Sequence, residues 1–212
     1  MRLLKILLWI SFPVFVVALA ASLLTTRPYM QLSKGLYDSH EAIEYDHDYV
    51  SGELMDYLNY KRDDLNFGPN AETEGPVLRD IEIRHMEDVK DVYTGVRIAG
   101  LLALVAFVAS GLVLYKKDIH FFYKSLKNIY ILPAFVILFI GGWFIIDFSL
   151  VFTIFHQLFF TNDDWILYSD DVLIQLLPQM FWLVSGALIL LILALFMVLV
   201  IWFNKKLIKP KL

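Results

Sequence analysis

Residues 176–203 read LLPQMFWLVSGALILLILALFMVLVIWF, a stretch of 28 residues without a charged side chain. A helix needs about 20 mostly apolar residues to cross the roughly 30 Å of hydrocarbon in a bilayer. Three other runs reach a comparable length, at 6–24, 98–115 and 129–152. The sequence therefore predicts an all-α membrane protein with four transmembrane helices.

The composition agrees with this fold class. Hydrophobic residues make up 58% of the chain, and the mean hydropathy is +0.62, more apolar surface than one soluble core can bury. The first run follows Arg2 and Lys5 and contains Ala18-Leu19-Ala20, so a cleaved signal peptide is an alternative there. Its apolar stretch exceeds the roughly 7 to 15 residues of a signal peptide, which favours a membrane span.

The distribution of charge predicts the orientation. Lysine and arginine flank both ends of the chain and fill the connection at 116–127, and such flanks stay in the cytoplasm. The loop at 26–93 has 16 acidic and seven basic residues, and the loop at 153–177 has four acidic and no basic ones. We therefore expect a multi-pass protein of the cell membrane with cytoplasmic termini and two acidic loops on the outer face.

The first outer loop is too long to be a simple connection, so we expect a sizeable extracytoplasmic cap. Within it, Ser51 is expected to cap a helix that ends near Arg62, and a second helix is expected from about Asp80 into the second span. Pro178 is expected a few residues inside the last helix. The predicted segments are transmembrane helix 1 (1–25), the cap loop (26–93), transmembrane helix 2 (94–115), a cytoplasmic loop (116–127), transmembrane helix 3 (128–152), a second outer loop (153–175), transmembrane helix 4 (176–203) and a cytoplasmic tail (204–212).

The sequence has no cysteine, which excludes disulfides, thiol nucleophiles and thiolate metal ligands. The acidic outer loops favour cationic groups as partners, and we expect no nucleic acid. His40 and His47, with nearby aspartates, are possible metal ligands, but neither a His-x-x-x-His pair nor a Cys/His cluster is present. We expect no metal and no cofactor.

Two histidines in the outer segments are candidates for chemistry. His85 lies in RHMEDV (84–89), where helical spacing puts Asp88 on the same face, close enough to orient the imidazole or raise its pKa. His156 lies in IFHQLFF (154–160), an unusually apolar setting for an idle histidine. The alternatives are a solvated helix face for His85 and a structural imidazole bonded to a backbone carbonyl for His156. The predicted topology puts both on one side of the membrane.

Two charges fall within or beside the apolar runs. Arg97 lies near the outer end of the second span and Asp147 near the outer end of the third. A charge in lipid is costly unless it is paired, and the two could pair beneath the outer loops, although the sequence does not decide whether they do. For Arg97 alone, snorkelling toward lipid phosphates is the alternative.

The chain resembles the bacterial lipoprotein intramolecular transacylases over essentially its whole length. The resemblance rests on the four-span layout, on RHMEDV (84–89), and on FHQLFF (155–160) followed by Trp165 and Asp171. It implies that one acyl chain moves from the sn-2 position of a diacylglyceryl group to the α-amino group of the same lipoprotein's N-terminal cysteine, which gives the lyso-form. Diacylated lipoproteins and lipids of the outer leaflet would be the partners.

The resemblance also implies that His85 and His156 are the catalytic pair. Our hypothesis from the sequence makes His85 the base, oriented by Asp88, and makes His156 the group that stabilises the oxyanion or protonates the departing oxygen. Arg97, Asp147 and Trp165 are the other expected supporting residues. Two alternatives remain: a non-enzymatic adaptor or sensor that binds a partner through the acidic loop, and a metal-dependent hydrolase that uses His40 and His47.

Overall fold

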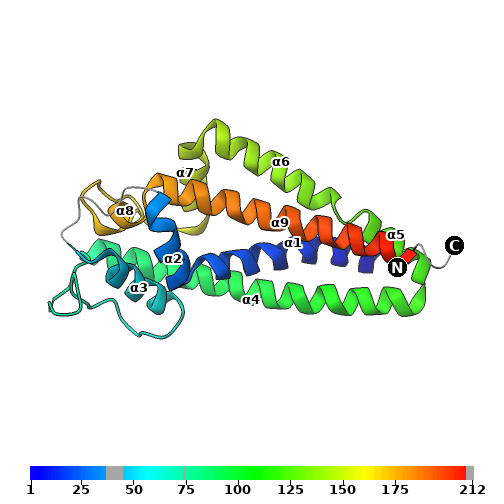
Figure 1. Cartoon of the computed structure of the whole chain (residues 1–212), viewed down its shortest axis with the longest axis horizontal. Coiled ribbons are helices and arrows are strands. Elements are labelled where there is room, and N and C mark those ends of the chain that lie inside the picture. The colour runs from blue at the N-terminus through cyan, green and yellow to red at the C-terminus, as the bar shows by residue number, and fades with distance from the viewer. Residues whose placement is uncertain (37–44, 74, 209–212) are drawn as a thin grey trace. The chain divides into compact units, whose positions relative to one another are not determined.

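The computed structural model describes residues 1–36, 45–73 and 75–208, and within these ranges its regular secondary structure is all helical, with no strand. Figure 1 labels the helices in chain order. They are α1 (Arg2–Leu24), α2 (Arg27–Ser33) with a 3₁₀ turn at Lys34–Leu36, α3 (His47–Leu58), α4 (Asp80–Lys117), α5 (Ile119–Lys127), α6 (Ile131–Ile146), α7 (Phe148–Phe159), α8 (Val172–Leu176) and α9 (Gln179–Ile208).

Among the described residues, four helical segments are long and apolar enough to cross a membrane, which confirms the predicted all-α class with four spans. They are Arg2–Leu24, Asp80–Lys117, Ile119–Ile146 and Gln179–Lys206. The helix expected from about Asp80 does run without a break into the second span. With 38 residues, α4 is far longer than the roughly 20 that a span requires, so its acidic first turns lie outside the apolar part.

The third apolar run is not a single helix. α6 ends at Ile146, and Asp147 leaves the helical conformation with φ −150° and ψ 87°. Its carboxylate accepts a hydrogen bond from the backbone N–H of Leu150 at 2.9 Å and so caps α7. The expected helix through Phe152 is therefore interrupted, and His156 belongs to a separate short helix.

Three other expected helix boundaries are wrong. Asp46, not Ser51, caps α3, because its carboxylate accepts hydrogen bonds from the N–H groups of Asp48 and Tyr49. Ser51 lies inside that helix, which ends at Leu58 rather than near Arg62. Pro178 precedes α9 instead of lying within it, a position where its missing N–H costs no helical hydrogen bond.

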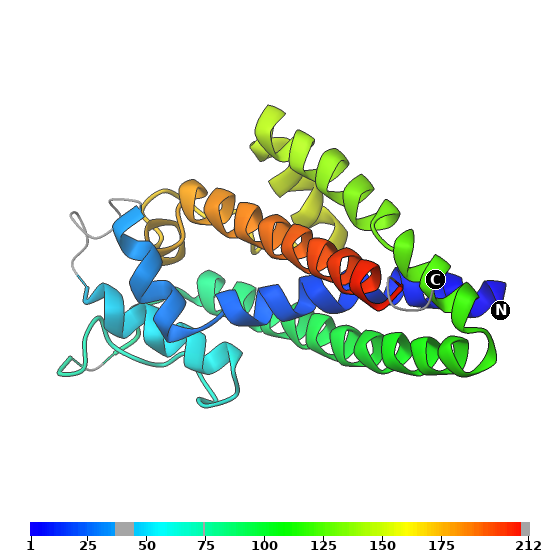
Figure 2. The same ribbon diagram turned by 45° about the vertical axis from the view of Figure 1, so that its right-hand side comes forward.

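The chain divides into two compact units. The first comprises Met1–Ala21, Val96–Ile146 and Ala187–Leu212. In it α1 lies beside α4 and α9, as both ribbon views show (Figures 1 and 2), and buried Leu8, Leu114 and Leu193 meet in its core. A Cβ at Gly100 would lie 2.4 Å from the Cβ of Ala18, so glycine is what lets α4 approach α1 this closely.

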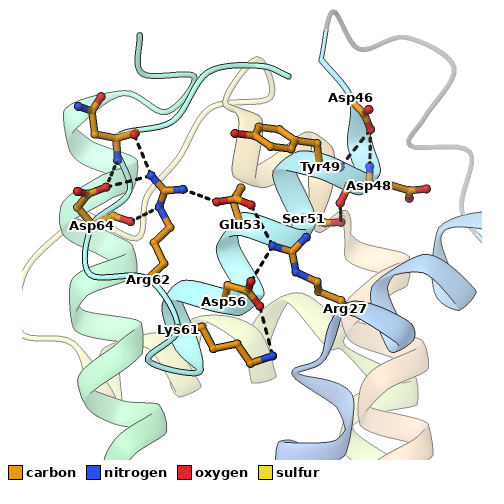
Figure 3. A network of polar contacts seen from close by, with 11 residues as sticks. Arg27, Asp46, Asp48, Tyr49, Ser51, Glu53, Asp56, Lys61, Arg62 and Asp64 are labelled. Atoms are coloured by element: carbon orange, nitrogen blue, oxygen red, sulfur yellow. Dashed lines mark hydrogen bonds and ion pairs between the residues drawn. The ribbon is translucent and has the colours of Figure 1, made fainter. Parts of the chain in front are cut away.

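The second unit comprises Ser22–Gly95 and Asp147–Gly186. Its core packs Met30, Leu54 and Met86 against Leu176 and Phe181. Figure 3 shows an ion-pair network on its surface between α2 and α3. Within that network, the Arg27 guanidinium lies 2.9 Å from a Glu53 oxygen and 2.7 Å from an Asp56 oxygen, and Arg62 pairs with Glu53 from the other side. The histidines of the candidate site and the side chains around them belong to this unit.

Candidate active site

The structure brings together the two histidines that the sequence singled out. His85 lies near the start of α4, and His156 lies in α7. Their ring centroids are 6.0 Å apart, with 30° between the ring planes. The side chains come from segments 71 positions apart in the chain, yet only 8% of His85 and 7% of His156 is exposed. Two imidazoles this close and this buried form a candidate catalytic pair.

Aromatic rings surround the pair. The Phe160 ring meets His85 edge-on at 5.2 Å, and the Phe152 and Trp165 rings lie 4.0 Å and 5.0 Å from His156. Trp165, one of the expected supporting residues, therefore lies beside His156, and its role stays a prediction. Rings of this kind exclude water and lower the local dielectric, which disfavours a charged imidazole.

A backbone hydrogen bond selects the tautomer of His156. Its Nδ1 lies 2.7 Å from the carbonyl oxygen of Phe152, one turn earlier in α7. A carbonyl only accepts, so Nδ1 carries the proton, and the neutral ring keeps its lone pair on Nε2. The bond to a backbone carbonyl, which was the structural alternative for His156, is therefore present. The same bond leaves the lone pair on Nε2, where it can accept a proton.

His85 is held differently. Its Nδ1 is buried and makes no hydrogen bond to any described residue. Burial, followed by the nearness of His156, lowers the pKa of His85 to about 4, against the weaker opposing effects of Asp88 and Asp164. Asp88 does act to raise the pKa of His85, but loss of hydration outweighs the attraction of the carboxylate. Burial also lowers the pKa of His156, although its bond to Phe152 acts in the other direction.

These shifts predict that both imidazoles are neutral at pH 7. In an NMR titration of the purified chain in micelles, we expect His85 to titrate near pH 4 and His156 below the ordinary value of about 6.5. Between about pH 6.5 and about pH 4, His85 is protonated in the unfolded chain but neutral in the folded chain. The free energy of unfolding should therefore fall as the pH drops from about 6.5 to about 4. A midpoint for His85 at or above about 6.5 would contradict the described burial.

Asp88 forms its hydrogen bond with the loop that follows α7 rather than with His85. Its Oδ2 accepts a hydrogen bond from Asn162 Nδ2 at 2.7 Å. One turn earlier, the Arg84 guanidinium makes two bonds of 3.0 Å to the Asp164 carboxylate. The next residue is Trp165, so these contacts hold its indole against His156. Sequence reasoning missed Arg84, Asn162 and Asp164, since their partners lie more than 70 positions away.

A buried carboxylate forms the second link between α4 and this loop. Glu82 is fully buried and accepts hydrogen bonds from the N–H of Arg79 at 2.9 Å and from the N–H of Leu173 at 2.8 Å. The first bond caps α4 and the second satisfies the first turn of α8. Asp171, the N-cap of α8, instead pairs with the Arg79 side chain and accepts from the N–H of Tyr168. No local pattern in the sequence distinguishes Glu82 from the other acidic residues.

Asp147 and Arg97 are two further residues that were expected to support the site. Asp147 caps α7, as described, and Arg97 belongs to the first unit. Their pairing stays a prediction. For the alternative metal site, His40 lies outside the described residues, and within 1–36, 45–73 and 75–208 no three His, Asp or Glu side chains are grouped to hold a metal ion.

Solved structures with the same fold exist. The membrane-integral lipoprotein intramolecular transacylase Lit from Bacillus cereus superimposes with a TM-score of 0.77 at 22% identity, over 99% of this chain and 96% of that one. Two further structures of that protein, with one histidine replaced by arginine or by alanine, each give a TM-score of 0.75 at 22% identity, over 99% of this chain and 92% or 94% of theirs. At this identity the likeness establishes the fold alone.

Sequence comparison establishes the family. A search of curated proteins finds no match. The family model for the lipoprotein intramolecular transacylase Lit matches residues 3–182, which include both histidines, the loop that carries Trp165 and three of the four apolar spans. Because this match extends over most of the sequence, the chain is a multi-pass membrane transferase that belongs to the lipoprotein intramolecular transacylase Lit family.

Proposed function

We propose that this chain transfers the sn-2 acyl chain of a diacylglyceryl-modified lipoprotein to the α-amino group of the same N-terminal cysteine. The observation that carries the proposal is the enclosed pair of imidazoles, His85 and His156, in a chain of this family. Attack of an amine on an ester needs no nucleophile from the enzyme, so a chain without cysteine can perform it. It needs a proton acceptor and stabilisation of the oxyanion.

The tautomer favours His156 as the base. The amine nitrogen attacks the ester carbonyl carbon, and Nε2 of His156 accepts a proton from that nitrogen. The same ring then returns the proton as the bond to the sn-2 oxygen breaks, leaving a free hydroxyl and an amide. This assignment reverses our hypothesis from the sequence, in which His85 was the base. Base catalysis of this kind typically contributes about 10²- to 10⁴-fold.

His85 suits the other role. A pKa of about 4 keeps the His85 imidazole neutral at pH 7. A neutral imidazole carries one N–H, which can donate a hydrogen bond to the oxyanion. Because both reacting groups belong to one substrate, holding them in a near-attack geometry supplies a further large part of the rate. The loop held by Arg84 and Asp88 supports that geometry by keeping Trp165 against the base.

We further propose that the second unit is an extracytoplasmic cap and that both termini are cytoplasmic. The support is the distribution of charge, with 16 acidic and seven basic residues at 26–93 and lysines and arginines at the opposite flanks. An acidic surface attracts the cationic amino terminus of a lipoprotein and raises its local concentration. The outer leaflet would then supply the diacylated substrate.

A purified, reconstituted chain given a synthetic diacylated lipopeptide tests the proposal. Substrate and product are isomers of equal mass, so tandem mass spectrometry must locate the acyl chain on nitrogen rather than on glycerol. We expect conversion to the N-acyl form that continues in the presence of a chelator. A matched lipopeptide with an acetylated α-amine should remain unchanged, because it has no amine to accept the acyl chain.

Two results would overturn the proposal. No conversion by the folded chain would support the adaptor interpretation, and conversion abolished by the chelator would support a metal-dependent hydrolase.

A further inference from the structure

A second candidate binding site lies in the first unit, among residues that the transacylase site does not use. An apolar hollow of about 350 Å³ opens between the start of α1 and the start of α6. Its walls are Ile6, Trp9, Ile10, Ile131, Leu132 and Phe135. A neighbouring hollow of about 330 Å³ shares Ile6 and Trp9 with it and extends toward α5. Because the two hollows share these residues, we treat them as one groove with an apolar end and a polar end, and call it the α1–α5 groove.

The second hollow is basic. Arg2, Lys5 and Lys124 line it, beside Phe121 and Ser125. None of the three cations forms an ion pair with a described residue, although the Lys5 ammonium lies 4.1 Å above the Trp9 ring. The unit has 11 basic residues and one acidic residue, Asp118, whose carboxylate caps α5. The positive charge in the groove is therefore not balanced within this unit.

The wall between the two hollows is fixed. The Trp9 indole donates a hydrogen bond to the backbone carbonyl of Ser125 at 2.9 Å, which ties α1 to α5. The indole therefore lines both hollows, with its N–H bonded to Ser125 and the Lys5 ammonium over its ring. This arrangement is the one that aromatic residues adopt at the boundary between acyl chains and headgroups.

We propose that the α1–α5 groove binds an anionic glycerophospholipid. Its phosphate would lie among Arg2, Lys5 and Lys124, and one acyl chain would run past Trp9 into the hollow lined by Ile10 and Phe135. A zwitterionic lipid has its own cation beside the phosphate and gains less from three unpaired positive side chains. Basic hollows that continue into an apolar groove between membrane helices suit lipids with net negative headgroups. The proposal does not depend on the transacylase reaction.

Native mass spectrometry can test this with the full chain in an equal mixture of phosphatidylglycerol and phosphatidylcholine. We expect the wild-type chain to retain phosphatidylglycerol about tenfold over phosphatidylcholine. The triple variant R2Q/K5Q/K124Q should lose about this whole preference. A matched variant, K116Q/K117Q/K205Q, removes three cations that do not line the groove and should change the preference less than about twofold.

A second variant tests the apolar end with every charge in place. Ile10→Trp fills the hollow beside Trp9, so we expect it to reduce the number of retained lipids of both kinds. Absence of the preference in the wild-type chain would overturn the proposal. Equal loss of the preference in both triple variants would also overturn it, by showing a general effect of net charge. Retention that is unaffected by Ile10→Trp would overturn the placement of the acyl chain.

Discussion

Replacing His156 with alanine is expected to reduce the rate of acyl transfer about 10³-fold, because Nε2 of this ring is the proposed proton acceptor. His156→Asn is the sharper variant. The asparagine amide can still donate to the carbonyl of Phe152, so it preserves the anchoring bond while offering no base. It should be as inactive as alanine. The measurement is the initial rate of N-acylation of the synthetic lipopeptide, with exposed His120→Ala as the control.

The companion variants at His85 should behave differently. His85→Ala removes a donor to the oxyanion, a loss of about 10²- to 10³-fold. His85→Asn restores an N–H near the position of the ring and should recover part of the rate. This asymmetry separates the two roles. If asparagine rescues position 156 but not position 85, the roles are the reverse of those proposed here.

Replacing Glu82 with alanine is expected to lower the free energy of unfolding by about 3 kcal/mol, because two backbone N–H groups lose a charged acceptor. Both bonds lie in the buried link between α4 and α8. For a chain of this size such a loss lowers the melting temperature by about 6 to 12 °C. Differential scanning fluorimetry in detergent measures it. Glu82→Gln keeps one acceptor oxygen and should fall between wild type and alanine.

Arg84→Ala is the matched control on the same helix. Its ion pair with Asp164 is at the surface, with 55% of the arginine side chain exposed, and surface pairs contribute about 0 to 1 kcal/mol. The melting temperature should therefore change little. Glu82→Ala with no more effect than Arg84→Ala would show that the buried carboxylate does not stabilise this link.

The spans and the two histidines could be predicted because their signals are local. A run of 18 apolar residues is visible in the sequence, and His156 stood out because its neighbours are phenylalanines. The break at Asp147 was not predictable in the same way, since Ile146 before it and Phe148 after it are equally apolar. A lone aspartate at that position fits a charge that pairs in the membrane as well as it fits a helix cap.

Other features depended on contacts that no spacing reveals. Asp46 and Ser51 are both good helix caps, and only the fold decides between them. Glu82 is one of 22 acidic residues, and its partner Leu173 is 91 positions away. The effect of burial on His85 was missed for the same reason. Spacing identified Asp88 as a neighbour but could not weigh it against the aromatic rings that arrive from α7.

The ion-pair network of Figure 3 limits how this family of sequences can vary. A Cβ at Gly52 would lie 2.2 Å from a guanidinium nitrogen of Arg27, whose head lies over that glycine while it holds Glu53 and Asp56. A side chain at position 52 would push this guanidinium from its present place over the glycine, where it contacts both carboxylates. We therefore expect related sequences that keep arginine at position 27 to favour glycine at position 52.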